Sequence, residues 1–234
     1  MDRIAELTKE YSPVPLSDDQ LKKLSSVSEA LRRIHGSLNV TNLNTDEEIA
    51  LLHYVDSLTA AQTGLFDGKN VIDVGCGGGF PTFPLAVAFP GSSFTALDST
   101  AKKLAFVEET AESAGITNVR TLCARAEDAG RSSGREGYDV AVSRGVARLN
   151  TLCEWCLPLV KVGGSFVAMK GRSGREEAAE AENAIKTLGG GEVRIIDVGI
   201  PVFNREHTLI VIKKLSHTPA AYPRAGGAIK KKPL

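Results

Sequence analysis

The stretch NVIDVGCGGGFP, residues 70–81, decides the fold, because an apolar strand pattern runs directly into four glycines within five positions. Glycine costs conformational entropy, so such a cluster indicates that something approaches the backbone closely. In α/β proteins a turn between the carboxyl end of a strand and the next helix is a ligand site. The stretch therefore predicts a parallel sheet with a binding site at its carboxyl edge.

Short β-branched runs alternate with helical stretches from Lys69 onward, which indicates βαβ units and helices on both faces of a sheet. Strands are predicted near 70–74, 93–98, 119–123, 138–143 and 164–170, with helices near 82–88, 100–114, 147–160 and 174–188. Two further strands, near 192–199 and 207–213, follow without a full helix between them and are expected to pair antiparallel. The fold class is therefore α/β, with a mostly parallel, seven-stranded, Rossmann-like sheet.

Residues 1–65 read as an N-terminal helical extension. Ser17 with Gln20, and Thr45 with Glu48, form two capping boxes that each open a helix. Apolar residues recur at threes and fours, as on one helix face, at Leu16, Leu21, Leu24, Val27, Leu31, Ile34 and Leu38. We expect three parts: the extension at 1–65, the α/β domain at 66–216 and a tail at 217–234.

The charge is balanced overall but uneven along the chain. Formal net charge is +0, yet the segment 213–234 carries six Lys or Arg and no acid. Two interpretations of this basic tail stay open: a solvated, frayed terminus, or a segment that orders on an anionic partner. No run of eighteen apolar residues and no secretory signal is visible, so we expect a cytoplasmic protein without a membrane helix.

Cys153 and Cys156 form a C-x-x-C pair, which raises the question of a metal or redox site. A second ligand pair at metal spacing is missing, because His207 and His217 do not supply one. Both cysteines also continue a helical apolar pattern. We therefore predict that they are core residues and expect no metal site.

The glycine spacing distinguishes two nucleotide motifs. The dinucleotide fingerprint G-x-G-x-x-G fails at Phe80, where it requires a third glycine. The stretch instead reads acid-x-G-x-G-x-G, with Asp73, Gly75, Gly77 and Gly79, and this form resembles the first motif of S-adenosylmethionine-dependent methyltransferases. An NAD-dependent dehydrogenase is the disfavoured alternative.

Acids after the second and third strands fit a nucleoside ligand. Asp98 ends the second strand, twenty-three residues after Gly75, where a carboxylate accepts hydrogen bonds from ribose hydroxyls. The alternative is that Asp98 caps the helix that starts near Thr100. Ala126 and Glu127 follow the third strand, at the expected position of an adenine, although Glu127 fits a surface loop equally well.

The end of the fourth strand, Ser143-Arg144, is informative through what it lacks. It has neither the [N/D]-P-P-[F/Y] motif of amine methylation nor the thiolate nucleophile of pyrimidine C5 methylation. Arg144 offers fixed donors to a phosphate, a carboxylate or a guanine edge, with a simple ion pair as the alternative.

Taken together, these residues resemble the glucose-inhibited division protein B family, bacterial methyltransferases of guanine N7 in 16S ribosomal RNA. The resemblance covers nearly the whole chain through "NVTNL" at 39–43, "HYVDSL" at 53–58, "DVGCGGGFP" at 73–81, "ALDS" at 96–99, "RAED" at 125–128, "VSRGVARL" at 142–149, "MKG" at 169–171, "REHTLIVIKK" at 205–214 and "YPRAGGAIKKKPL" at 222–234. This chain departs from the family at Thr82-Phe83, where members commonly carry Gly, and at Gly145-Val146, where they commonly carry Ala-Phe.

The resemblance implies a class I methyltransferase that binds S-adenosylmethionine through Gly75, Phe80, Ala126, Glu127 and Arg144, with Asp98 in the ribose role. It implies one guanine of 16S ribosomal RNA, within the small subunit, as substrate. Guanine N7 has an exposed lone pair and no proton to remove, so positioning and electrostatics matter more than a base. We assign no catalytic base or nucleophile.

Arg144 is the first candidate for positioning, and Lys170, at the end of the fifth strand, is the second, although a lysine there is more often simply exposed. His53 and Asp56 share a helix face, and an ordinary i,i+3 surface pair is the favoured interpretation. The predicted phosphate contacts are Arg172, Arg205, Arg224, Lys230, Lys231 and Lys232, with Arg175, Lys213 and Lys214 as further candidates. We expect a monomer. A non-catalytic RNA-binding protein and a small-molecule methyltransferase stay open as alternatives.

Overall fold

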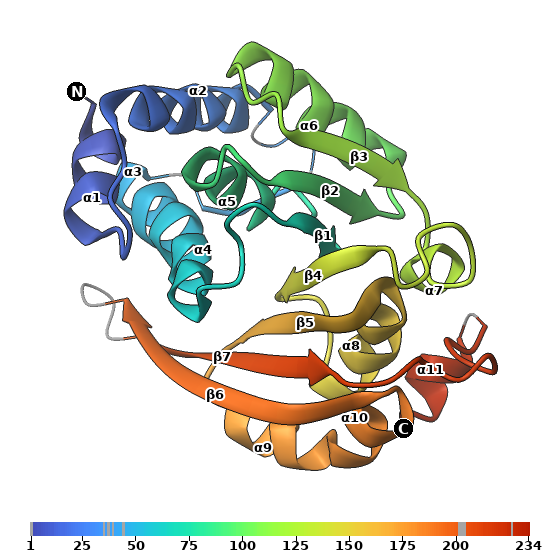
Figure 1. Ribbon diagram of the computed structural model, residues 1–234. Helices are drawn as coiled ribbons and strands as arrows, with labels where there is room; N and C mark the ends of the chain where they lie inside the picture. Colours follow the sequence, from blue (N-terminus) through green and yellow to red (C-terminus); the bar gives the residue numbers. More distant parts are fainter. Residues whose placement is uncertain are drawn as a thin grey trace.

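One seven-stranded sheet, in the order β3-β2-β1-β4-β5-β7-β6, organises the computed structural model (Figure 1). The structure describes residues 2–34, 36, 38, 40–43, 45–200, 205–225 and 227–234, without the side chains of Arg205 and Lys230. The strands are β1 (Asn70–Val74), β2 (Ser93–Asp98), β3 (Val119–Cys123), β4 (Tyr138–Arg144), β5 (Val160–Lys170), β6 (Gly190–Ile200) and β7 (Arg205–Lys214). The first five are parallel, and β7 lies between β5 and β6 and runs antiparallel to both. The predicted antiparallel pairing of the last two strands is confirmed, whereas the insertion of β7 next to β5 was not predicted.

Helices precede, connect and cover the strands. They are α1 (Arg3–Tyr11), α2 (Asp18–Ile34), α3 (Asp46–Glu48), α4 (Asp56–Thr59), α5 (Thr82–Ala88), α6 (Ala101–Ser113), α7 (Ala126–Ala129), α8 (Leu149–Cys156), α9 (Gly174–Glu180), α10 (Glu182–Thr187) and α11 (Ala228–Lys231). A π-helical segment, η1 (Ile49–Val55), joins α3 to α4, and a 3-10 turn, η2 (Ala60–Thr63), follows α4.

Both predicted capping boxes are present. The Ser17 hydroxyl accepts a hydrogen bond from the backbone N–H of Gln20 at 3.2 Å, and the side-chain oxygen of Gln20 accepts one from the backbone N–H of Ser17 at 2.8 Å. Thr45 and Glu48 make the same reciprocal pair. The helix predicted over 147–160 ends at Cys156, followed by a 3-10 turn that contains Pro158, so β5 starts earlier than predicted.

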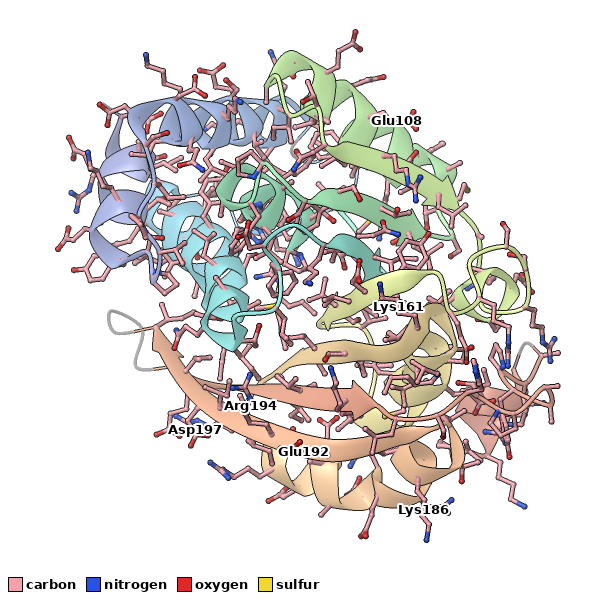
Figure 2. The ribbon with its side chains drawn as sticks, in the orientation of Figure 1. Glu108, Lys161, Lys186, Glu192, Arg194 and Asp197 are labelled. Carbon is pink, nitrogen blue, oxygen red and sulfur yellow. The ribbon has the colours of Figure 1, made fainter. Side chains whose placement is uncertain are left out.

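The sheet is buried on both faces, which explains its nearly continuous apolar strands. Val71 belongs to the face of the sheet that packs against α5, α6 and the N-terminal helices. Ile72, the next residue, belongs to the opposite face, which packs against α8, α9 and α10. Figure 1 shows the two helical layers on opposite sides of the sheet. The N-terminal helices share one hydrophobic core with the sheet, and Arg194 of β6, labelled in Figure 2, donates to the Thr63 carbonyl at 3.0 Å.

The segment after β7 is packed, so the interpretation as a frayed or substrate-ordered tail is wrong for its described residues. Arg224 forms a fork of hydrogen bonds, 2.6 to 3.1 Å, to the carboxylate of Glu154, which is fully buried on α8. Lys214 is also fully buried and donates to the Leu157 carbonyl at 2.6 Å. Ile229 of α11 is fully buried. Arg224 and Lys214 therefore hold the fold together. Burial closes Lys214 to a phosphate, whereas the phosphate contact of Arg224 stays a prediction, because 26% of its side chain is exposed.

We expect Glu154→Gln to lower the free energy of unfolding by about 3 kcal/mol, because it removes the charge that neutralises Arg224 in a pair whose carboxylate is fully buried. Denaturant unfolding would measure the loss, and trypsin would cut faster after Arg224. The matched control is Glu180→Gln, whose partner Arg148 is exposed; that change should cost less than about 1 kcal/mol. Equal effects of the two variants would contradict a structural role for the pair of Arg224 and Glu154.

Candidate cofactor and active site

The predicted cofactor residues lie around one cleft at the carboxyl edge of the sheet. The cleft has two adjoining parts, which share Gly75, Asp98 and Val146. The first part, about 170 Å³, lies over the ends of β2 and β3 and includes Ala126 and Glu127 in its lining. The second part, about 330 Å³, lies over the ends of β1 and β4, where Gly77, Phe80 and Arg144 line it. Residues far apart in sequence thus form one continuous lining.

The three glycines of the motif have positive φ angles of 79°, 55° and 90°, which favour glycine, but they serve different purposes. A Cβ on Gly79 would lie 2.3 Å from Phe83, and one on Gly75 would lie 2.7 Å from Val146, so packing requires both glycines. A Cβ on Gly77 would meet nothing within 4 Å. Gly77 therefore leaves the space that a ligand needs beside the backbone.

Asp98 combines the two roles considered for it. One carboxylate oxygen accepts from the Gly77 amide at 3.2 Å, and the other accepts from the Thr100 amide at 2.9 Å, at the start of α6. Each oxygen can accept more than one hydrogen bond, so the carboxylate keeps capacity for ligand hydroxyls. The cap and the ribose role are therefore compatible.

Asp73 lies below the glycine turn, fully buried, and is not part of the cleft lining. One carboxylate oxygen accepts from the Thr82 amide and hydroxyl at 3.2 and 2.6 Å. The other has no partner among the described residues. Burial raises the pKa of Asp73 to about 7. An orphaned carboxylate oxygen beside a glycine turn suits a ligand that brings an ammonium group, as S-adenosylmethionine does.

We expect Asp98→Ala to weaken S-adenosylmethionine binding by roughly one to two orders of magnitude, the scale of lost charged hydrogen bonds. Isothermal titration calorimetry would measure the change. The control is Glu109→Ala, which removes an exposed carboxylate of α6, the helix that follows Asp98. This variant should bind the cofactor as the wild type does. An unchanged affinity in Asp98→Ala would refute the ribose assignment.

A buried polar cluster around Arg144 corrects the interpretation of His53 and Asp56 as a surface pair. Both are buried, at 7% and 5% exposure. Arg144 donates to the Leu52 carbonyl at 3.0 Å, to Asp56 at 2.6 Å and to His53 Nδ1 at 3.2 Å. His207 of β7 donates to the other oxygen of Asp56 at 2.6 Å. The N-terminal extension therefore supplies hydrogen-bond partners to Arg144, which lines the cleft.

Asp56 is the anion at the centre of this cluster. Burial would raise the pKa of Asp56, but the hydrogen bond from His207 and the charge of Arg144 outweigh it and hold that pKa below its usual value. The carboxylate is therefore ionised and neutralises the Arg144 charge within the site. The local sequence contains no signal for this, since the partners are 88 and 151 residues away.

The hydrogen bonds fix the tautomer of His53. Arg144 can only donate, so Nδ1 of His53 accepts and Nε2 carries the hydrogen, which it donates to the Thr41 hydroxyl at 2.7 Å. Burial, followed by the Arg144 charge, lowers the pKa of His53 to about 3, so the ring is neutral. The ring also stacks on Phe80, with centroids 4.2 Å apart. His53 thus connects a cleft residue to the segment around Thr41.

The other predicted residues lie in different surroundings. Lys170 is not simply exposed, because its ammonium pairs with Glu177 at 2.6 Å and donates to the Ala147 carbonyl at 2.8 Å. Arg172, Lys231 and Lys232 are exposed, whereas the side chains of Arg205 and Lys230 lie outside the described residues. Cys153 and Cys156 are fully buried in the core, as predicted.

No helix in the described part of the chain is long and apolar enough to cross a membrane. No group of three or more His, Cys, Asp or Glu side chains there is arranged to hold a metal ion.

We expect the stability of the protein to fall on acidification, partly because of His53. The unfolded chain protonates this residue near its ordinary pKa of 6.5, while the folded chain resists protonation down to about 3. Stability is therefore fully present above the unfolded pKa and is lost as the pH falls, by up to about 1.4 kcal/mol per pH unit. His53→Phe keeps a ring on Phe80 and should show a shallower loss in urea unfolding at graded pH. Parallel profiles for the two proteins would contradict the buried, neutral assignment.

The fold and the cleft define a class I S-adenosylmethionine-dependent methyltransferase. A solved structure with the same fold, an S-adenosylmethionine-dependent O-methyltransferase from Thermotoga maritima, superposes with a TM-score of 0.54 at 14% identity, over 82% of this chain and 73% of the other. Geranyl diphosphate methyltransferase, solved with S-adenosylmethionine, gives a TM-score of 0.52 at 15% identity, over 77% and 95%.

Sequence comparison gives the particular family. The model of the family described as rRNA small subunit methyltransferase G matches residues 20–208. A relative of that name from Alkaliphilus oremlandii is 42% identical over 94% of this chain and 93% of its own, and one from Alkaliphilus metalliredigens is 40% identical over 94% and 92%. This chain belongs to the rRNA small subunit methyltransferase G family.

Proposed function

We propose that this protein transfers a methyl group from S-adenosylmethionine to N7 of one guanine in 16S ribosomal RNA, within the small subunit. The observation that supports this best is the state of the side chains at the Arg144 end of the cleft: Asp56 neutralises Arg144, and His53 is neutral with both ring nitrogens hydrogen-bonded. Cys76, the thiol of the glycine turn, is buried, and burial raises the pKa of that thiol far above its usual range. Such a site suits an acceptor atom that needs no deprotonation.

The cleft residues divide the cofactor between them in this proposal. Ala126 and Glu127 hold the adenine, and Asp98 holds the ribose. Gly75, Gly77 and Phe80 hold the methionine part together with Asp73 and Arg144. When bound, S-adenosylmethionine supplies an electrophilic methyl group on a sulfonium.

The protein's own contribution is to position and to balance charge. Guanine N7 attacks with a lone pair in the plane of the ring, and no proton has to leave, so the gain comes from orientation and fixed electrostatics. Asp56 cancels the charge of Arg144, and the neutral His53 adds none. A cleft with little net positive charge accommodates a cationic cofactor and, after transfer, a cationic base.

The exposed basic residues supply contacts to the RNA backbone. Arg172, Lys231 and Lys232 are the exposed candidates, and Arg205, Lys230 and the half-buried Arg224 complete the proposed set. Contacts of this kind position RNA without reading its sequence and make binding depend on salt. We propose further that the protein acts as a monomer in the cytoplasm, with residues 66–216 as the methyltransferase domain, 1–65 as its helical extension and 217–234 as its basic segment.

The test is methyl transfer from labelled S-adenosylmethionine to small ribosomal subunits that lack the modification. Naked 16S RNA and DNA run beside them, and strand scission at N7-methylguanine maps the product. We expect label at one guanine, with a rate that falls as salt rises. Label on adenine, on a guanine amine or on no RNA at all, with cofactor binding intact, would overturn the proposal.

A further inference from the structure

A second, smaller cavity lies directly beyond the cofactor cleft. It has a volume of about 150 Å³, and its lining includes Asp56, Arg144, Gly145, Lys170, His207 and Thr208. Arg144 and Gly145 also line the cofactor cleft, so the two spaces adjoin at the end of β4. Register pairs Arg144 with Met169 of β5, and Lys170 with Thr208 of β7. The cavity therefore lies over the carboxyl ends of β4 and β5, beside the methionine half of the cleft.

The geometry points to this cavity as the pocket for the acceptor guanine, an inference that rests on the proposed function. A transferable methyl group in the cleft needs its acceptor atom close by, and this cavity adjoins the part of the cleft assigned to methionine. The side of the cleft that contains Ala126 and Glu127 shares no lining residue with the cavity.

Arg144 has the hydrogen-bonding capacity that a guanine requires. Three of its five N–H groups bind Leu52, Asp56 and His53, and the remaining two have no partner among the described residues. An arginine donor suits O6 of guanine, which lies on the same edge as N7. Adenine presents an amino donor in place of O6, so the same arginine disfavours it.

His207 and Thr208 supply polar groups at the mouth of the cavity. Because ionised Asp56 only accepts, Nδ1 of His207 carries the hydrogen of that bond, which leaves Nε2 as an acceptor in the neutral ring. Thr208 is buried, with 5% of its surface exposed, yet its hydroxyl has no hydrogen bond within the described structure. An acceptor and a hydroxyl suit the donor groups of a guanine base or a sugar.

A surface groove of about 480 Å³ continues outward from the same two residues. Arg172 and Arg175 line it, paired with Glu206 at 3.9 Å and with Asp197 at 2.5 Å. Figure 2 labels Asp197 on the outer strand β6. Exposed ion pairs are weak, so an RNA phosphate can take either arginine from its acid. The groove thus gives the nucleotides next to the guanine a path away from the cavity.

The test fills the cavity without touching the cofactor cleft. Gly171 lines the cavity, its φ is not left-handed and a Cβ there meets nothing within 4 Å, so Gly171→Val should fold. Thr208→Val removes the hydroxyl at constant shape. We expect both to lower kcat/KM for small ribosomal subunits, Gly171→Val by roughly tenfold or more, because a displaced acceptor loses alignment. The affinity for S-adenosylmethionine, measured by calorimetry, should not change.

Gly91→Val is the matched control, since Gly91 also faces open space but precedes β2, at the opposite edge of the sheet. It should methylate as the wild type does. A photoreactive p-benzoylphenylalanine at position 171 should cross-link to the guanine that receives the label. Wild-type rates in both cavity variants, loss of cofactor binding in step with activity, or cross-links remote from that guanine would overturn the pocket. Failure of the wild-type protein to label RNA would instead overturn the proposed function.

Discussion

The ion pair between Arg144 and Asp56 is the interaction on which the site depends. A half-buried arginine is stabilised by a carboxylate close by, and the carboxylate that pairs with Arg144 comes from the N-terminal helical run rather than from the sheet. Meeting that requirement places the extension on the carboxyl edge of β4, and His207 binds the same carboxylate from β7. One neutralised charge thus fixes three parts of the chain relative to each other, and the cleft and the second cavity lie on either side of it.

The glycine turn and this cluster solve different problems. The turn makes room: two of its glycines let Phe83 and Val146 pack against the backbone, and Gly77 leaves space for a ligand. The cluster supplies rigid donors next to that space without adding net charge. The carboxylate that neutralises Arg144 comes from outside the Rossmann-like sheet, on the N-terminal extension. The extension must therefore stay fixed against the sheet, and the hydrophobic core that the two share holds it there.

Sequence patterns were sufficient for the sheet, the capping boxes and the cofactor class, because each depends on neighbours within a few residues or on a short motif. They failed for His53 and Asp56, since spacing along a helix cannot show that a face meets an arginine 88 residues further on. They also missed the structural contact of Arg224, since its partner Glu154 lies 70 residues earlier. In both cases the charged side chain makes a structural ion pair with a residue far away in the sequence, which no local pattern indicates.

The position of β7 between β5 and β6 has a consequence for biosynthesis. The chain makes β6 before β7, yet β6 pairs in the sheet through β7. During vectorial synthesis β6 must therefore wait without a partner strand until β7 has left the exit tunnel. His207, which completes the Asp56 cluster, arrives with that same strand. Pairing of β6 and completion of the Asp56 cluster thus both wait for β7, so nascent chains that lack β7 have neither.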